Sequence, residues 1–426
     1  TKYLCLHYET VIYNGPGFSG RKQVNKKAAT KPAKAVFYYL SFFQNVNLQS
    51  LAGIYIHIPF CKQACTYCNF HFSTLYTNAA EMVNGIATEI LLPNEFIDHS
   101  QTIETIYFGG GTPSILSTSS IIQLLLCIEK KFTITANPEI TLEANPDDIT
   151  AVTLLNWKNA GINRLSVGIQ SFDEEELKWM NRAHNVSESI KCLAEINDAG
   201  FNNYSADLIY GSATQGNKLF QKNLEILFQY KVPHISCYAL TVEPKTALHH
   251  LIEKKKYPPV NTDEQANAFE TICTLMKEKG YEQYEISNFC RHGFRSRHNS
   301  SYWQGKPYWG FGPAAHSFNG KNKRRWNIAN NTLYLQSISK NNIPFEEEIL
   351  TMEQQMNEAI LISLRTSEGL GLKNFSTKFG KNNAEKLLKN AQKFIAQEKM
   401  IFYNQRLLVK DEGKFLADGI AADLFF

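Results

Sequence analysis

After residue 50, the chain alternates short, β-branched apolar runs with longer amphipathic stretches. The short runs are GIYIHI (53–58), ETIYF (104–108), EITLEA (139–144), NRLSVGI (163–169), YSADLIY (204–210) and HISCYAL (234–240). Helical periodicity lies between them at 79–92, 118–131, 148–160, 187–199 and 217–230. Strands that alternate with helices predict a parallel sheet with right-handed crossovers. Six such units predict an α/β fold, an open TIM-like (β/α)6 partial barrel.

The pattern changes in the last 80 residues. Helical periodicity covers 352–366, 373–380 and 383–397, and residues 400–410 predict a short hairpin around Asn404, followed by a final helix at 415–424. Helices followed by a hairpin predict a smaller C-terminal helical domain, winged-helix-like, over residues 346–426. A lid over the barrel is the alternative.

Charge is distributed unevenly. The chain has 44 Lys or Arg and 40 Asp or Glu, but residues 1–50 hold seven of the bases and one acid, Glu9. That leaves 37 basic against 39 acidic residues from 51 onward, so no electrostatic case exists there for a nucleic-acid partner. No apolar run reaches the roughly 18 residues of a membrane span, although peripheral contact with membrane acceptors stays open.

Three of the nine cysteines crowd into one segment, Cys61, Cys65 and Cys68, with the spacing C-x3-C-x2-C directly after a predicted strand. A loop of this kind can hold a [4Fe-4S] cubane by three thiolates and leave the fourth iron open to a small molecule. A zinc site completed by His57 or His71 is the alternative. An odd cysteine number and this clustering do not indicate disulfides, so a reducing, cytoplasmic location is predicted.

The cysteine spacing together with YIHIPFC (55–61) resembles the radical S-adenosylmethionine (SAM) proteins of the oxygen-independent coproporphyrinogen III oxidase family. The resemblance implies a radical SAM core over residues 51–290, with a [4Fe-4S] cluster on the three cysteines and SAM on the open iron. It also implies an electron donor for the cluster. No catalytic side chain is assigned.

The same resemblance assigns SAM contacts to residues around FGGGTP (108–113) and at successive strand ends. Glycines let a backbone approach a ligand closely, carboxylates can hold ribose hydroxyls or an ammonium group, and arginine can hold a carboxylate. The assigned residues are Tyr55, Tyr67, Gly110, Gly111, Thr112, Glu143, Gln170, Arg182 and Asp207.

Two positions distinguish the branches of this family. Its porphyrinogen-converting members carry a further cysteine two residues after the third ligand, where this chain has Phe70. SRHNSSYW (296–303) matches H-N-x-x-Y-W, the haem-associated motif of the haem-chaperone branch. The resemblance therefore implies haem binding by His298, as axial ligand, with Asn299, Tyr302 and Trp303, in a connecting region over 291–345.

The predicted function is to bind haem and transfer it to haem-accepting apoproteins. The alternative is oxidative decarboxylation of coproporphyrinogen III to protoporphyrinogen IX, and an RNA-modifying enzyme is disfavoured by the charge balance. A homodimer is compatible with the sequence but has no specific support in it.

Residues 1–50 are predicted to be upstream sequence or disordered, because LAGIYIHIPFC (51–61) resembles the family's usual start with Leu51 in the place of the initiator methionine. A signal peptide, with the basic stretch 21–34 before AVFYYLSFF (35–43), is one alternative. An N-terminal arm like that of the oxidases is another. The intact mass of the natively expressed protein distinguishes these hypotheses.

Overall fold

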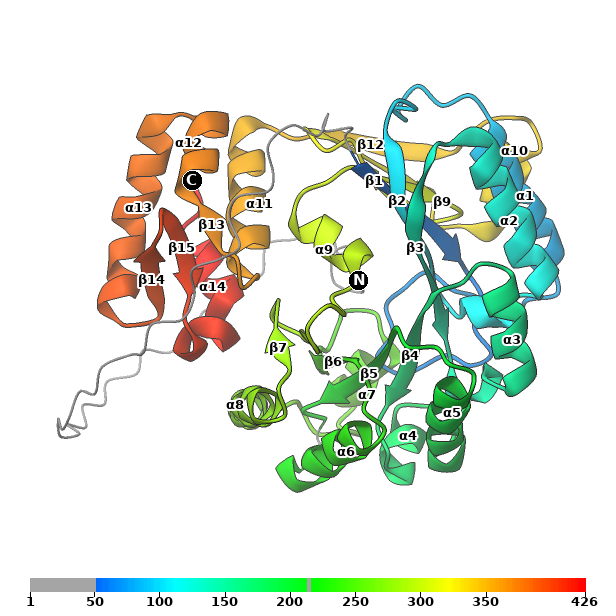
Figure 1. Ribbon diagram of the computed structural model, residues 1–426, viewed down its shortest axis with the longest axis horizontal. Helices are drawn as coiled ribbons and strands as arrows, with labels where there is room; N and C mark the ends of the chain where they lie inside the picture. Colours follow the sequence, from blue (N-terminus) through cyan, green and yellow to red (C-terminus); the bar gives the residue numbers. More distant parts are fainter. Residues whose placement is uncertain (1–50, 213–215) are drawn as a thin grey trace. The chain divides into compact units, whose positions relative to one another are not determined.

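The computed structural model describes residues 51–212 and 216–426 (Figure 1). The predictions made for residues 1–50 therefore lie outside the described residues.

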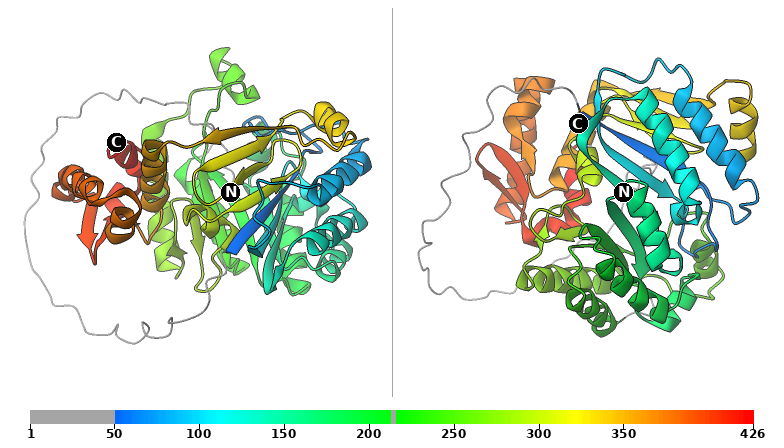
Figure 2. Two further views of the ribbon diagram at one scale, coloured as in Figure 1. Left: turned by 90° about the horizontal axis from the view of Figure 1, so that it is seen from above. Right: turned by 45° about the vertical axis from the view of Figure 1, so that its right-hand side comes forward.

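Six parallel strands in chain order form the centre of a 12-stranded sheet. They are β1 (Leu51–Ile58), β2 (Thr102–Gly110), β3 (Ile134–Ala144), β4 (Arg164–Gln170), β5 (Tyr204–Tyr210) and β6 (His234–Ala239). The helices between them lie along one face of this sheet (Figures 1 and 2): α1 (Ala79–Leu91), α2 (Thr118–Lys131), α3 (Ala151–Asn159), α4 (Glu174–Trp179), α5 (Val186–Asp198) and α6 (Asn217–Gln229). The predicted α/β fold with a partial (β/α)6 barrel is confirmed.

Side chains along these strands alternate between two faces, because successive residues of a strand point to opposite sides. One face is apolar and packs in the core with the helices, as Ile54, Ile106 and Leu142 show. The opposite set, which we call the polar face, comprises Tyr55, His57, Thr105, Tyr107, Glu139, Glu143, Ser166 and Asp207, and all but Glu143 are less than 9% exposed. The polar face therefore offers hydrogen-bonding groups inside the barrel.

Shorter strands extend the sheet at both edges. β9 (Tyr308–Phe311) runs parallel to β1 and is followed outward by antiparallel β10 (His316–Phe318), β11 (Lys323–Asn327) and β12 (Phe345–Ile349). β8 (Asn288–Cys290) pairs antiparallel with β6 and carries β7 (Glu282–Gln283). Helices α7 (Ala247–Glu253), α8 (Thr262–Glu278), α9 (Arg297–Trp303) and α10 (Asn331–Ile338) complete this part of the chain. The sequence did not predict these edge strands.

The C-terminal residues form helices and a hairpin with a separate apolar core. The elements are α11 (Met352–Leu364), β13 (Leu370–Gly371), α12 (Leu372–Phe379), α13 (Lys381–Ala396), β14 (Met400–Tyr403), β15 (Arg406–Val409) and α14 (Ala417–Ala422). Asn404 and Gln405 both have positive φ, as a tight two-residue hairpin turn requires. The predicted final helix is shorter than expected, because Asp411–Leu416 forms a 3-10 helix before α14.

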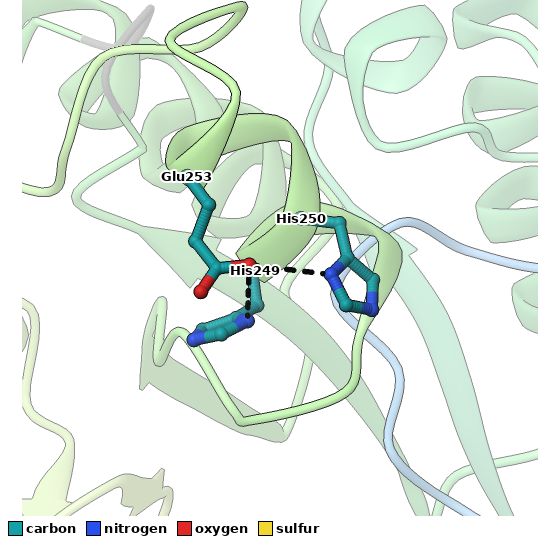
Figure 3. Close-up of side chains that lie close together, drawn as sticks. All are labelled: His249, His250 and Glu253. Carbon is teal, nitrogen blue, oxygen red and sulfur yellow. Dashed lines mark hydrogen bonds and ion pairs between the residues drawn. The ribbon is translucent and has the colours of Figure 1, made fainter.

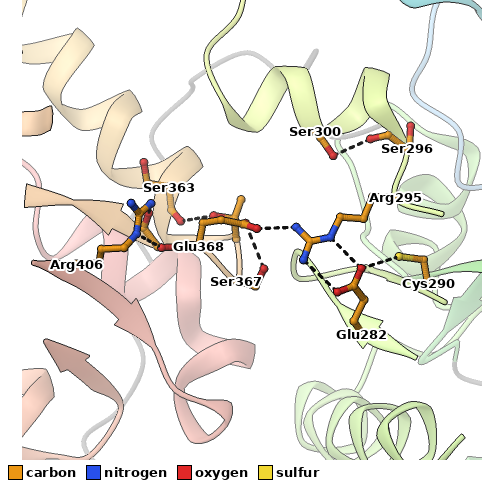
Figure 4. Close-up of polar contacts among 11 residues, drawn as sticks. Glu282, Cys290, Arg295, Ser296, Ser300, Ser363, Ser367, Glu368 and Arg406 are labelled. Carbon is orange, nitrogen blue, oxygen red and sulfur yellow. Dashed lines mark hydrogen bonds and ion pairs between the residues drawn. The ribbon is translucent and has the colours of Figure 1, made fainter. Parts of the chain in front are cut away.

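Polar contacts join this C-terminal module to the segment before α9 (Figure 4). Arg295 Nε donates to Glu282 Oε1 at 3.0 Å, and its Nη1 donates to Glu368 Oε1 at 2.5 Å. The Ser367 N–H donates to the Tyr284 carbonyl at 3.0 Å. The helix α9 itself contacts β1 and β2 on one side and α11 on the other.

None of the described helices has the length and apolar character needed to cross a membrane.

Candidate functional site

The loop after β1 carries Cys61, Cys65 and Cys68, all partly exposed. Backbone hydrogen bonds hold it at several points: the Cys61 N–H donates to the Ser73 carbonyl at 3.0 Å, and the Thr66 N–H to the Met180 carbonyl at 3.1 Å. The Leu248 N–H of α7 donates to the Thr66 carbonyl at 2.8 Å. The three thiols thus share one well-anchored loop at the carboxyl end of a parallel strand, which is where α/β barrels place their sites.

The Gly-rich turn after β2 packs against the start of this cysteine loop. The Gly111 N–H donates to the Ile58 carbonyl at 2.8 Å, and the Thr112 N–H to the Phe60 carbonyl at 2.6 Å. A side chain at Gly111 would collide with the Phe60 backbone, and Gly110 has a φ of 110° beside the His57 ring. The resemblance assigns these glycines to the SAM site, and in the structure they also allow the close approach of the chain that leads into Cys61.

Arg182 connects the cysteine loop with the ends of β3 and β4. Its Nη1 lies 3.2 Å from Cys65 Sγ, and its Nη2 donates to Asn145 Oδ1 at 2.8 Å and to the Gly168 carbonyl at 3.0 Å. Burial opposes the charge, but the neighbouring Cys65 sulfur raises the pKa of the Arg182 guanidinium. Within residues 51–212 and 216–426, Arg182 Nε and Gln170 Nε2 are buried without a hydrogen-bond partner. Two buried donors are therefore available beside the cysteine loop.

The predicted carboxylates and tyrosines lie around the same strand ends. Glu143 accepts a hydrogen bond from Tyr107 OH at 2.8 Å, and Asp207 accepts one from Ser166 Oγ at 3.4 Å. Tyr55 OH lies 3.2 Å from His57 Nδ1. Tyr67 packs against an apolar cluster formed by Met180, Ile209, Leu240 and Leu248.

The donor set fits a cluster with a SAM molecule better than the zinc alternative. His57 has both ring nitrogens engaged, Nδ1 with Tyr55 OH and Nε2 with the His71 carbonyl at 2.9 Å, and burial lowers its pKa to about 4. His71 Nε2 is hydrogen-bonded to Asn331 Oδ1 at 2.7 Å. Among the described residues, His57 is therefore a poor fourth ligand, and the three thiols beside two unpartnered buried donors, Gln170 Nε2 and Arg182 Nε, suit an open-iron cubane and a polar ligand.

His298, the predicted haem ligand, lies on α9 and is only 1% exposed. Its Nδ1 is hydrogen-bonded to Thr105 Oγ1 at 2.7 Å and its Nε2 to Tyr302 OH at 3.0 Å. The ring stacks on Tyr107 with a centroid distance of 4.9 Å, and burial lowers the pKa of His298 to about 3. The imidazole is neutral, as an iron ligand must be, but ligation requires one ring nitrogen to exchange its partner.

The other residues of the haem motif point to different neighbours. Asn299 is buried at the start of α9, where its N–H donates to the N-cap Ser296 Oγ at 3.2 Å. Trp303 is partly exposed and lies under the Arg365 guanidinium of the C-terminal module at 5.2 Å. The motif therefore joins the barrel to the module, with His298 and Tyr302 on the barrel side.

Three polar-face residues that surround His298 were not predicted. Thr105 and Tyr107 contact its ring, and Glu139 accepts hydrogen bonds from the backbone N–H groups of Arg297 at 3.1 Å and His298 at 3.0 Å. The alternation in ETIYF and EITLEA was the available signal, since Thr105, Tyr107 and Glu139 share one strand face.

A second group of potential ligands lies on α7 (Figure 3). The Nδ1 atoms of His249 and His250 lie 3.5 and 3.3 Å from Glu253 Oε2. Glu253 and His250 are largely exposed, so these contacts are surface ion pairs when the histidines are protonated, and such pairs add little stability.

Comparisons with known proteins agree with this geometry. The Radical SAM superfamily matches residues 55–225, and the HemN C-terminal domain matches residues 350–416. The chain is 31% identical over 375 residues to "Heme chaperone HemW" of Bacillus subtilis, covering 87% of this chain and 98% of that protein. The chain belongs to the HemW family of radical SAM proteins.

Other comparisons extend this result. The Lactococcus lactis protein of the same name is 30% identical over 388 residues, covering 88% of this chain and 99% of that protein. Coproporphyrinogen III oxidase (HemN) from Escherichia coli has a similar structure, with a TM-score of 0.76 at 20% identity over 88% of this chain and 90% of that one. That likeness shows the shared fold. Membership of the radical SAM proteins implies a [4Fe-4S] cluster and SAM as cofactors.

Proposed function

We propose that this protein binds haem and transfers it to haem-accepting apoproteins, as the name of its HemW relatives says of them. The observation that carries the proposal is the neutral His298 imidazole between Tyr107 and Tyr302. A neutral imidazole is a haem ligand, and aromatic rings can pack on a porphyrin. Haem iron bound to His298 Nε2 would replace the hydrogen bond between Nε2 and Tyr302 OH.

Cys61, Cys65 and Cys68 would hold the cluster, which together with SAM supplies one-electron chemistry when an external donor reduces it. Arg182 places a positive charge 3.2 Å from Cys65 Sγ. Gln170 Nε2 and Arg182 Nε can donate to SAM, while Glu143 and Asp207 can accept from it. The proposed SAM site is also lined by the remaining assigned residues, Tyr55, Tyr67, Gly110, Gly111 and Thr112.

A second candidate function, oxidation of coproporphyrinogen III, is favoured by the fold shared with HemN. Phe70 stands where the resemblance places a further cysteine in the porphyrinogen-converting members. The α9 residues match the haem-associated motif of the haem-chaperone branch. Haem transfer therefore explains more of the chain.

The domain division, the location and the oligomeric state belong to the same proposal. We assign residues 51–290 to the radical SAM core, 291–345 to the haem-motif connection and 346–426 to the C-terminal domain, and the matches at 55–225 and 350–416 support the first and last. A cytoplasmic location is supported by the described cysteines, which are all free thiols. A homodimer stays a prediction.

The test is an anaerobic haem titration of the cluster-reconstituted protein, followed by transfer of the bound haem to apomyoglobin as a general acceptor. His298→Ala should weaken haem binding at least about tenfold, the loss of one iron ligand, while the cluster absorbance stays intact. His292→Ala, an exposed histidine nearby, is the matched control. Tyr302→Phe removes the hydroxyl that competes for Nε2 and should tighten haem binding.

Two results would contradict the proposal. An unchanged titration in the folded His298→Ala protein would defeat the axial assignment. Repeated turnover of coproporphyrinogen III to protoporphyrinogen IX, with SAM and a reductant, would establish the oxidase function instead.

A further inference from the structure

The strand β2 carries contacts to both proposed sites. Thr105, Tyr107 and Gly109 are alternate residues on one side of the strand, which ends at Gly110 and is followed by Gly111. Thr105 binds the His298 ring, while the glycines form the turn at the cysteine loop. At about 3.3 Å per residue, the six steps from Thr105 to Gly111 span roughly 20 Å. Tyr107 lies between these two ends.

Tyr107 touches residues of both sites with one buried side chain. Its hydroxyl donates to Glu143 Oε1 at 2.8 Å, and its ring stacks on His298 with an interplanar angle of 21°. The same ring lies 6.2 Å from that of Tyr55, its register partner on β1, and Tyr107 is 2% exposed. A shift of Glu143 or of His298 must therefore be accommodated by the Tyr107 ring, because packed interiors leave little free space.

We propose that Tyr107 is a positioning residue that couples the SAM site to the haem site, so that SAM bound at Glu143 opposes haem binding at His298. The inference rests on the proposed function. A ligand held by Glu143 fixes the carboxylate and, through the hydroxyl of Tyr107, the ring on which His298 stacks. Haem ligation needs His298 to leave Tyr302, which disturbs that stack.

Coupling of this kind must be reciprocal, because it is a difference in free energy between the same four binding states. SAM should raise the dissociation constant of haem by at least about fivefold, the lower end of typical coupling. Haem should raise the dissociation constant of SAM by the same factor. Omitting the reductant prevents SAM cleavage during both titrations.

The experiment uses the full chain with its reconstituted cluster, titrated anaerobically with haem at zero and at saturating SAM, and then with SAM at zero and at saturating haem. Tyr107→Phe keeps the stacked ring and removes the hydroxyl that donates to Glu143, so the ratio of dissociation constants should fall toward one. Tyr204→Phe is the matched control. It removes another buried tyrosine hydroxyl from a barrel strand, one that donates to Asn197 Oδ1 at 3.1 Å, far along the sheet from β2. Its ratio should equal that of the unchanged protein.

Each outcome separates the coupling from the function. Haem binding with a ratio of one, or tighter haem binding with SAM, in the unchanged protein overturns the coupling alone. A fivefold ratio that persists in Tyr107→Phe overturns the role of Tyr107. No haem binding at all overturns both the coupling and the proposed function, whereas loss of the ratio in Tyr107→Phe only, with intact circular dichroism, supports the inference.

Discussion

The two proposed sites differ in how completely their polar groups are satisfied. Beside the cysteine loop, Gln170 Nε2 and Arg182 Nε are buried with no partner among residues 51–212 and 216–426. At α9, both ring nitrogens of His298 and the first N–H groups of the helix are hydrogen-bonded. Unmet buried donors cost free energy unless a ligand satisfies them. The first site is therefore arranged for a polar ligand, and the second is closed by the protein itself.

This difference gives the sites different energetics. SAM can add hydrogen bonds at the cysteine loop without breaking any at Gln170. Haem at His298 must replace an existing hydrogen bond. The free energy of haem binding is therefore that of the iron–nitrogen bond, reduced by the free energy of the lost hydrogen bond to Tyr302. Weakened retention suits the proposed transfer of haem to an acceptor.

The largest expected effect follows from removal of one cysteine ligand. Cys65→Ala should abolish the cluster and SAM binding together, because the open iron of the proposed cluster would anchor SAM. Haem binding should stay within about threefold, under 1 kcal/mol. Iron and sulfide analysis and the haem titration measure the two sites separately. Cys127→Ala, on α2, is the control and should retain the full cluster. Loss of haem binding with the cluster would show that the sites are not independent in structure.

A pH titration of stability tests whether the surroundings of His57 and of His298 both exclude water. Burial lowers the pKa of His57 to about 4 and of His298 to about 3, against 6.5 for an exposed histidine. Below pH 6.5 the unfolded chain takes up protons that the folded chain excludes, so stability is complete above pH 6.5 and falls as the pH decreases toward 4. Each histidine should contribute a loss of about 2 kcal/mol between pH 6.5 and 5.

Urea unfolding at several pH values measures this slope. The slope of the unfolding free energy against pH reports the number of protons taken up on unfolding. His57→Gln or His298→Gln should reduce that number by one, while His292→Gln, at an exposed position, should leave it unchanged. An unaltered slope in His298→Gln would mean that water reaches the α9 side of the barrel and that the contrast between the sites is smaller than the contacts indicate.

The sequence was sufficient for the parts of the molecule that repeat a local pattern. All six parallel strands and the cysteine loop were predicted, because period-2 runs and close cysteine spacing are local signals. The strands β7–β12 were missed, because strands of two to five residues are too short to show a hydrophobic periodicity. The burial of His298 was also missed. It depends on Thr105 and Glu139, more than 150 positions away, which no local pattern can pair with α9.

A smaller effect is expected from the hydrogen bond that closes the haem motif. Thr105→Val keeps the shape and leaves His298 Nδ1 without its partner, so the free energy of unfolding should fall by roughly 1–2 kcal/mol. Thr141→Val is the matched control on β3, because Thr141 Oγ1 is buried without a partner among the described residues. It should be neutral or stabilising. Equal losses in the two variants would show that the bond to His298 contributes nothing.

The smallest effect on stability is expected at the Gln170 donor beside the cysteine loop. Gln170→Met keeps the length of the side chain and removes the Nε2 donor, which has no partner in the described chain. It should weaken SAM binding about tenfold, or 1.4 kcal/mol, with little loss of stability. Gln265→Met is the opposite case, because Gln265 Nε2 already donates to the Leu240 carbonyl at 2.9 Å. That variant should lose stability and keep its SAM affinity. If Gln170→Met instead destabilises the fold and leaves SAM binding unchanged, Gln170 is a structural residue, and the cysteine-loop site is as closed as α9.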